Sequence, residues 1–220
     1  LGIKVLRWPG GNFAGEFNWM DGLLPADMRA PFQSYLGLET QPHTMGYDFS
    51  EMNTDDFIAL CREIGAEPFI TINPCWNTPD ENAAWVEYCN GDVSTPYGKL
   101  RANRGHQEPY NVQFWSLGNE FGYGHMEGDN TPAGYCQIAL ENGKKMLEAS
   151  PGLSLCSSGP YPNKEWAEFS AKPLAGISQM ISQHYYGYDP HYTDLSTVEE
   201  EYNRCMASVS RMRELIHQSR

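Results

Sequence analysis

Short apolar runs alternate along the chain with stretches of helical spacing, a pattern typical of repeated βα units around a parallel sheet. This pattern predicts five strands, in the order Ile3–Arg7, Glu67–Asn73, Val112–Gly118, Leu153–Ser157 and Ile177–His184. No repeat, low-complexity segment or shift of composition marks a linker between them. We therefore expect one α/β domain.

Helix signals lie between these strands. Apolar residues recur at helical spacing from Phe57 and stop at Gly65, as in a helix that ends on a left-handed residue. The segment Thr78-Pro79-Asp80-Glu81 has the form of a capping box with proline at the first helical position. Ser196-Thr197-Val198-Glu199 is a second such box, and the apolar pattern of its helix still continues at Arg220.

The connection after the first strand is unusually long. Residues 12–52 are polar, glycine-rich and aromatic, and a βα connection of that length suggests a functional loop. A closed (β/α)8 barrel usually needs ~250 residues. The five predicted strands thus fit an arc of such a barrel, that is, an α/β fold of the TIM-barrel type that is incomplete in this chain.

Composition excludes some classes of function. The 28 Asp and Glu residues exceed the 15 Lys and Arg residues, giving a formal net charge of −13 that opposes a phosphate backbone. Nucleic acid is therefore not an expected partner. No apolar stretch approaches the ~18 residues that span a bilayer, so we expect no membrane segment.

The cysteines and histidines predict no metal centre. The six cysteines form no CxxC pair, and the histidines show no spacing of the HExxH kind, so neither a metal nor any other cofactor is expected. The chain has no Asn-x-Ser/Thr glycosylation acceptor, which slightly favours a cytoplasmic over a secreted protein. Localisation is otherwise unknown from the sequence.

Glu120 is the strongest candidate for a catalytic group. It follows Asn119 at the end of the third predicted strand, and polar residues at the carboxyl ends of parallel strands line active sites in such folds. Its neighbours are apolar and aromatic, an environment that disfavours the ionised carboxylate and suits a proton donor. The alternative is a glutamate that only caps a helix or forms a salt bridge.

Other strand ends carry candidate binding residues, each with a structural alternative. Pro9-Gly10-Gly11 either presents Asn12 to a ligand or is an ordinary turn. His184 near an apolar strand is either a site residue or a hydrogen-bonded core histidine. Of the tryptophans, only Trp76 follows a strand end, and it is the one that we expect to contact substrate; the alternative for Trp8, Trp19 and Trp115 is core packing.

Three segments stand at predicted strand ends: Leu6-Arg7-Trp8-Pro9-Gly10-Gly11-Asn12, Gly118-Asn119-Glu120 and His184-Tyr185-Tyr186. Between the first and second of them lie Gly65-Ala66-Glu67-Pro68 and Trp85-Val86-Glu87-Tyr88-Cys89-Asn90. In this combination the chain resembles the α-L-arabinofuranosidases of glycoside hydrolase family 51, which belong to a clan of retaining (β/α)8 glycosidases. The Asn-Glu pair alone indicates the clan, and the flanking segments indicate the family.

The resemblance implies a domain organisation and a role for each matching residue. Residues 1–220 are expected to be a partial catalytic (β/α)8 domain that holds strands 2 to 6, with the first strand, the last two strands and any C-terminal β-domain outside this sequence. Glu120 is expected to be the general acid/base and Asn119 to bind the sugar 2-hydroxyl. Arg7 is expected to orient the nucleophile, and Asn12 to bind sugar hydroxyls.

The resemblance also implies a nucleophile that the sequence does not supply. A retaining glycosidase needs a second carboxylate ~5 Å from the first. In this family it ends the seventh strand, expected after Arg220, with Tyr186 bonded to it and His184 beside Tyr186. We therefore expect residues 1–220 alone to be inactive.

The implied activity is release of terminal α-L-arabinofuranosyl residues from polysaccharides or oligosaccharides, by an enzyme that forms homo-oligomers as its relatives often do. Two alternatives stay open. One is an endo-β-glucanase or xylanase of the same clan. The other is a non-catalytic fragment or sugar-binding remnant.

Overall fold

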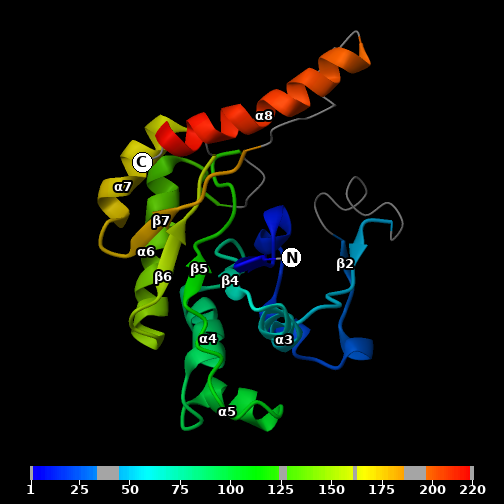
Figure 1. The fold of residues 1–220 in the computed structure, drawn as a ribbon. Coiled ribbons are helices and arrows are strands. Elements are labelled where there is room, and N and C mark those ends of the chain that lie inside the picture. Colours follow the sequence, from blue (N-terminus) through cyan, green and yellow to red (C-terminus); the bar gives the residue numbers. More distant parts are fainter. Residues whose placement is uncertain (1, 34–44, 124–127, 161–162, 186–196, 219–220) are drawn as a thin grey trace.

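The computed structural model describes residues 2–33, 45–123, 128–160, 163–185 and 197–218, and a parallel five-stranded sheet lies at its centre (Figure 1). The strand order follows the chain, and all four neighbouring pairs are parallel. Every predicted strand is present; each is shorter than predicted, and β1 extends one residue past its predicted end at Arg7. The strands are β1 (Val5–Trp8), β4 (Glu67–Thr71), β5 (Phe114–Ser116), β6 (Ser154–Ser157) and β7 (Ser178–Ile181).

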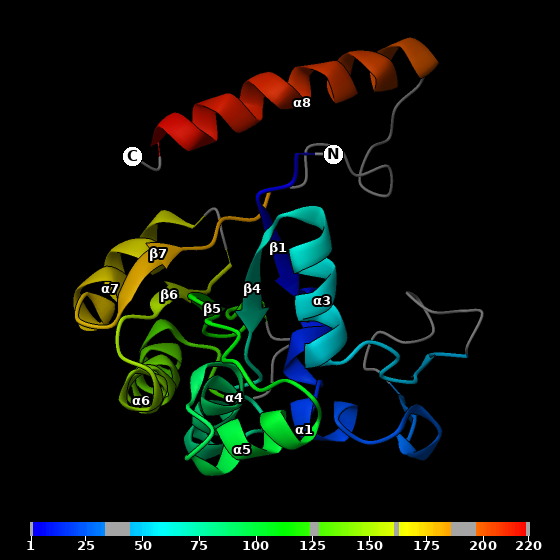
Figure 2. The ribbon, with the colours of Figure 1, turned by 60° about the horizontal axis from the view of Figure 1, so that its bottom comes forward.

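Helices connect consecutive strands of this sheet. The described βα units form an arc that does not close, as expected for an incomplete barrel. Figure 2 shows α3, α4, α6 and α7 around the outside of this arc, whereas α8 stands apart from it. Most apolar residues of α8 are exposed, for example Val198 at 82%. The helices are α3 (Thr54–Ile64), α4 (Pro79–Asn90), α5 (Pro96–Asn103), α6 (Pro132–Ala149), α7 (Lys164–Leu174) and α8 (Val198–Gln218).

Two of the three predicted helix signals are confirmed as stated. Helix α3 ends at Gly65, whose φ of 69° is left-handed, and Thr78 caps α4 in a reciprocal box with Glu81. Ser196, which the sequence predicts as the cap of the next box with Glu199, lies outside the described residues. In the structure Thr197 accepts from the backbone N–H of Glu200, because α8 begins at Val198.

The long connection after β1 contains short elements that the sequence did not predict. They are too brief to show a hydrophobic period. They comprise the 3-10 helices η1 (Gly11–Gly15) and η2 (Ala26–Met28), the helix α1 (Trp19–Gly22), and the antiparallel pair of β2 (Phe32–Gln33) and β3 (Tyr47–Asp48).

The core between the sheet and helices α3 and α4 contains a cluster of aromatic rings. Trp85 on α4 is fully buried, and its ring lies 6.0 Å from Trp8, 6.0 Å from Trp19 and 5.7 Å from Trp115. Core packing therefore accounts for Trp8, Trp19 and Trp115. Trp76, by contrast, is 66% exposed.

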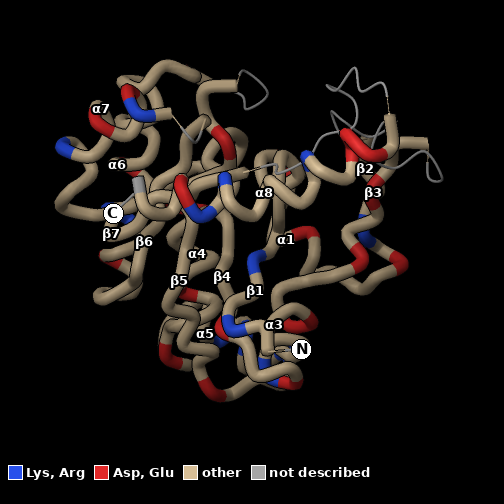
Figure 3. Tube along the Cα trace, turned by 45° about the horizontal axis from the view of Figure 1, so that its top comes forward, with Lys and Arg blue, Asp and Glu red and all other residues tan. Residues whose placement is uncertain are grey.

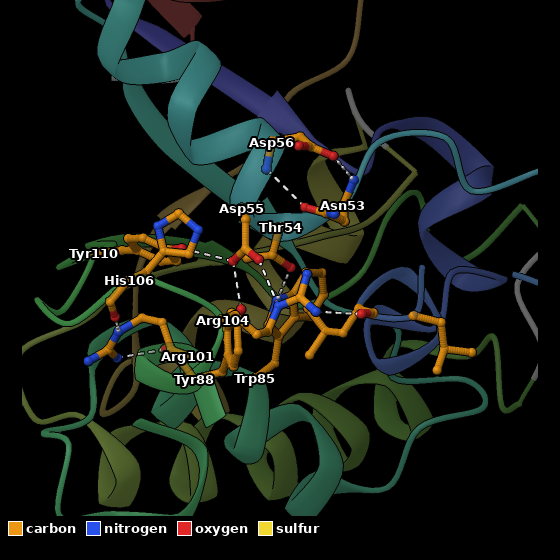
Figure 4. A network of polar contacts seen from close by, with 12 residues as sticks. Asn53, Thr54, Asp55, Asp56, Trp85, Tyr88, Arg101, Arg104, His106 and Tyr110 are labelled. Atoms are coloured by element: carbon orange, nitrogen blue, oxygen red, sulfur yellow. Dashed lines mark hydrogen bonds and ion pairs between the residues drawn. The ribbon is translucent and has the colours of Figure 1, made fainter. Parts of the chain in front are cut away.

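A buried polar cluster around Asp55 fixes α3 against α4 and the segment that leads into β5 (Figure 4). The Asp55 carboxylate accepts hydrogen bonds from the Tyr88 hydroxyl at 2.6 Å, the Tyr110 hydroxyl at 2.8 Å and Arg104 Nε at 2.9 Å. Nearby, the fully buried Arg101 donates to four backbone carbonyls. These hydrogen bonds hold α3, α4 and the segment before β5 together.

Charge is distributed over the whole described surface. Acidic residues lie scattered over the helices and loops, and the part of the chain drawn in Figure 3 carries no continuous basic stripe. None of the described helices combines the length and the apolar character that crossing a bilayer requires.

Candidate active site

The carboxyl ends of the strands gather the predicted site residues. Arg7 lies on β1, Asn119 and Glu120 follow β5, and His184 follows β7. Parallel strands end at the same edge of a sheet, so side chains far apart in sequence can meet there. Here they form one connected set of hydrogen bonds.

Glu120 and His184 form the closest polar contact of this set. His184 Nδ1 lies 2.7 Å from Glu120 Oε1, and both side chains are largely buried, with 17% and 11% exposed. On its other side, His184 Nε2 lies 3.3 Å from Arg7 Nη1. A guanidinium only donates, so Nε2 accepts from Arg7 and Nδ1 carries the hydrogen that is donated to Glu120.

Asn119 links Arg7 to Asn12. Its Oδ1 accepts from Arg7 Nη2 at 3.0 Å, and its Nδ2 donates to Asn12 Oδ1 at 3.0 Å. Because Arg7 can only donate, the orientation of the Asn119 amide is fixed. The Asn12 oxygen is thereby used within the protein, and its amide N–H groups remain as donors to a ligand.

The turn that presents Glu120 depends on its local sequence. Glu120 itself has a φ of 44°, a left-handed conformation that costs a non-glycine residue free energy. Gly118 has a φ of 90°, and a Cβ there would lie 2.6 Å from the Phe121 ring. Ser116 Oγ donates to the Gly118 carbonyl at 2.9 Å. The strained turn is therefore built by glycine and held by the end of β5.

The sheet face that carries Arg7 also carries a thiol. Cys156 on β6 is 3% exposed, and burial raises its pKa to about 12 even though the nearby Arg7 lowers it. The thiol therefore stays protonated near neutral pH. Within the described residues, no group of three or more His, Cys, Asp and Glu side chains is arranged to hold a metal ion.

Not every predicted site residue joins the Glu120 cluster. Tyr186 lies outside the described residues. Within the described residues Trp76 does not contact this cluster, and it lines a cavity of about 340 Å³ between the loop after β4 and the β2–β3 pair. Sequence reasoning missed the other residues of this cavity, such as Glu16 and Phe32, because no motif or period marks them.

Comparison with known proteins places the chain among arabinofuranosidases. The family described as alpha-L-arabinofuranosidase 1 domain matches residues 1–204. Alpha-L-arabinofuranosidase C of Emericella nidulans is 35% identical over 174 residues, which are 78% of this chain and 33% of the relative. An intracellular exo-alpha-(1->5)-L-arabinofuranosidase of Halalkalibacterium halodurans is 30% identical over 193 residues, or 85% of this chain and 37% of the relative.

A solved structure gives the same assignment for the fold. The thermostable GH51 alpha-L-arabinofuranosidase from Thermotoga petrophila superimposes with a TM-score of 0.76 and 36% identity, covering 94% of this chain and 41% of that one. The chain thus spans about a third to two fifths of the length of these similar proteins.

Proposed function

Because this chain belongs to the alpha-L-arabinofuranosidase 1 domain family of glycoside hydrolase family 51, we propose that the protein containing it releases terminal α-L-arabinofuranosyl residues from arabinose-containing carbohydrates. Glu120 is the general acid/base of this proposal. The observation that carries it is the largely buried Glu120 carboxylate, hydrogen-bonded at 2.7 Å to a histidine that is oriented by Arg7.

The hydrogen bond from His184 determines which oxygen of Glu120 acts. Oε1 accepts from His184 Nδ1–H, so the acidic proton is carried by Oε2. In the first step Oε2 gives this proton to the departing glycosidic oxygen while a nucleophilic carboxylate bonds to the anomeric carbon. In the second step the Glu120 carboxylate takes a proton from water, whose oxygen bonds to that carbon and releases the nucleophile.

The neighbours of Glu120 fit the remaining roles. Asn119 is held by Arg7 and Asn12, which supports its placement at the sugar 2-hydroxyl, and Asn12 keeps its amide donors for further hydroxyls. Arg7 supplies the positive charge that would orient the nucleophile. In a protein as long as the relatives, the nucleophile is expected beyond Arg220, where Tyr186 would reach it.

The experiment is an activity assay of the full-length protein with an aryl α-L-arabinofuranoside. Replacing Glu120 with Gln keeps the shape but removes the ionisable group, and we expect kcat/KM to fall by roughly 10²–10⁴-fold. Glu165→Gln, at an exposed carboxylate on α7, is the matched control and should leave kcat/KM unchanged. Full activity of the Glu120→Gln protein refutes the assignment.

A further inference from the structure

The cavity beside Trp76 lies on the loops that follow β1 and β4. Its volume of about 340 Å³ is at the lower end of the ~300–1,000 Å³ typical of small-molecule sites. Its described lining combines aromatic, amide and carboxylate groups. They include Glu16, Asn18, Asp21, Phe32, Gln33 and Trp76.

Trp76 is exposed, yet its backbone is rigidly held. The buried Asn73 side chain accepts from the backbone N–H groups of Cys75 at 3.1 Å and Trp76 at 3.2 Å, and donates to the Phe17 carbonyl at 3.2 Å. Asn82 in turn donates to the Asn73 carbonyl. An indole that is 66% exposed on so well-anchored a turn is a preorganised flat surface for a ligand.

The opposite wall of the cavity packs on the segment that carries Asn12, a member of the Glu120 cluster formed by Arg7, Asn12, Asn119, Glu120 and His184. Phe32 on β2 stacks on Phe13 with ring centroids 5.7 Å apart, and Phe13 is the residue after Asn12 in η1. Arg29 fixes the neighbouring loop by donating to the carbonyls of Ser50 and Glu51. One wall of this cavity is thus packed directly on the segment that carries Asn12.

The chemistry of the lining selects a class of ligand. A flat indole faces the C–H groups of a sugar ring, while carboxylates and side-chain amides bind its hydroxyl groups. The described lining contains Glu16 and Asp21 but no Lys, Arg or His, so the cavity repels anions. We infer that it is an accessory subsite for a second, neutral sugar ring of the oligosaccharide whose terminal residue occupies the catalytic cluster.

This inference rests on the proposed function, and its test separates the two. The full-length Glu120→Gln protein is titrated calorimetrically with arabinose and with linear arabinotriose. Adding Trp76→Ala should weaken arabinotriose binding about tenfold and leave arabinose binding unchanged, whereas Trp76→Phe should retain most of the affinity. Phe169→Ala, at another exposed aromatic residue on α7, is the control and should change neither.

Each outcome of the titration supports or refutes the subsite, the proposed function, or both. If both sugars bind and Trp76→Ala changes neither, or weakens both equally, the subsite is refuted while the proposed function stands. If neither sugar binds, the proposed function fails and the subsite with it. Trigalacturonate should not compete with arabinotriose, and competition at similar concentration overturns the selection of neutral sugars. Unchanged melting temperatures of the variants confirm that they are folded.

Discussion

Replacement of Asp55 by Asn should destabilise the fold far more than the same change at the next residue. Asp55 is 8% exposed and accepts three hydrogen bonds, one of them from the Arg104 guanidinium. Asparagine keeps the size but loses the charge and one acceptor oxygen. At least one of Tyr88, Tyr110 and Arg104 is then left without its acceptor (Figure 4).

The magnitude follows from the geometry. A buried polar group that loses its partner costs ~1–3 kcal/mol, and hydrogen bonds to charged groups are worth ~1.5–3 kcal/mol. The Arg104 side chain is 28% exposed, so solvent can replace part of its loss. We therefore expect Asp55→Asn to reduce the free energy of unfolding by about 2–3 kcal/mol, and Asp55→Ala by about 3–5 kcal/mol.

The assay is urea unfolding of the full-length protein, followed by tryptophan fluorescence. Asp56→Asn is the matched control, because the exposed Asp56 carboxylate accepts a single 3.3 Å hydrogen bond, from the backbone N–H of Asn53. Its expected cost is about 0.5 kcal/mol. If Asp55→Asn costs no more than Asp56→Asn, the Asp55 cluster does not stabilise α3 against α4 as argued.

Three further predictions concern pH, the turn at Gly118 that precedes Glu120, and self-association. Burial and, second, the hydrogen bond to Asp55 raise the pKa values of Tyr88 and Tyr110. The contribution of these hydroxyls to stability is therefore complete below the unfolded pKa of ~10 and is lost as the pH rises above it. In Tyr110→Phe the free energy of unfolding should fall less between pH 10 and 11 than in the wild type. Gly118→Ala should lower kcat in the arabinofuranoside assay about tenfold or more and reduce the free energy of unfolding by about 1–3 kcal/mol, because the added Cβ meets Phe121 in a left-handed turn. A wild-type kcat would show that Glu120 does not depend on this turn. Residues 1–220 alone should self-associate in sedimentation experiments, because within the described residues β1 and β7 are edge strands and most apolar side chains of α8 are exposed. A monodisperse, cooperatively melting chain would contradict this.

The sequence predicted the sheet well because its strands are apolar runs separated by helical spacing. All five strands were found, and the strand-end position of Glu120 brought it to the same edge as Arg7 and His184. Parallel strands make that meeting a consequence of topology. The contact between Glu120 and His184 was not predicted, because side-chain pairing across 64 residues depends on strand register and on the left-handed turn at Glu120.

The loop elements were less predictable. The described elements between β1 and α3 are only two to five residues long, shorter than any hydrophobic period, so their shape depends on contacts such as Phe13 with Phe32. For the same reason the surroundings of Trp76 could not be read from the sequence, although its position after a strand end could. At the start of α8 the sequence offers two caps, because Ser196 and Thr197 are both followed by Glu three residues later, and the described residues show Thr197 accepting from Glu200.

The site residues act as a directed chain because its central member can only donate. Arg7 gives hydrogen to His184 Nε2 on one arm and to Asn119 Oδ1 on the other. His184 must then donate to Glu120, and Asn119 must donate to Asn12. The direction of hydrogen bonding along each arm is therefore set by the Arg7 guanidinium. In the proposed mechanism this decides which Glu120 oxygen carries the proton and leaves the Asn12 amide N–H groups as donors to the sugar. Loss of Arg7 would release both arms at once, so single substitutions along this chain cannot be additive.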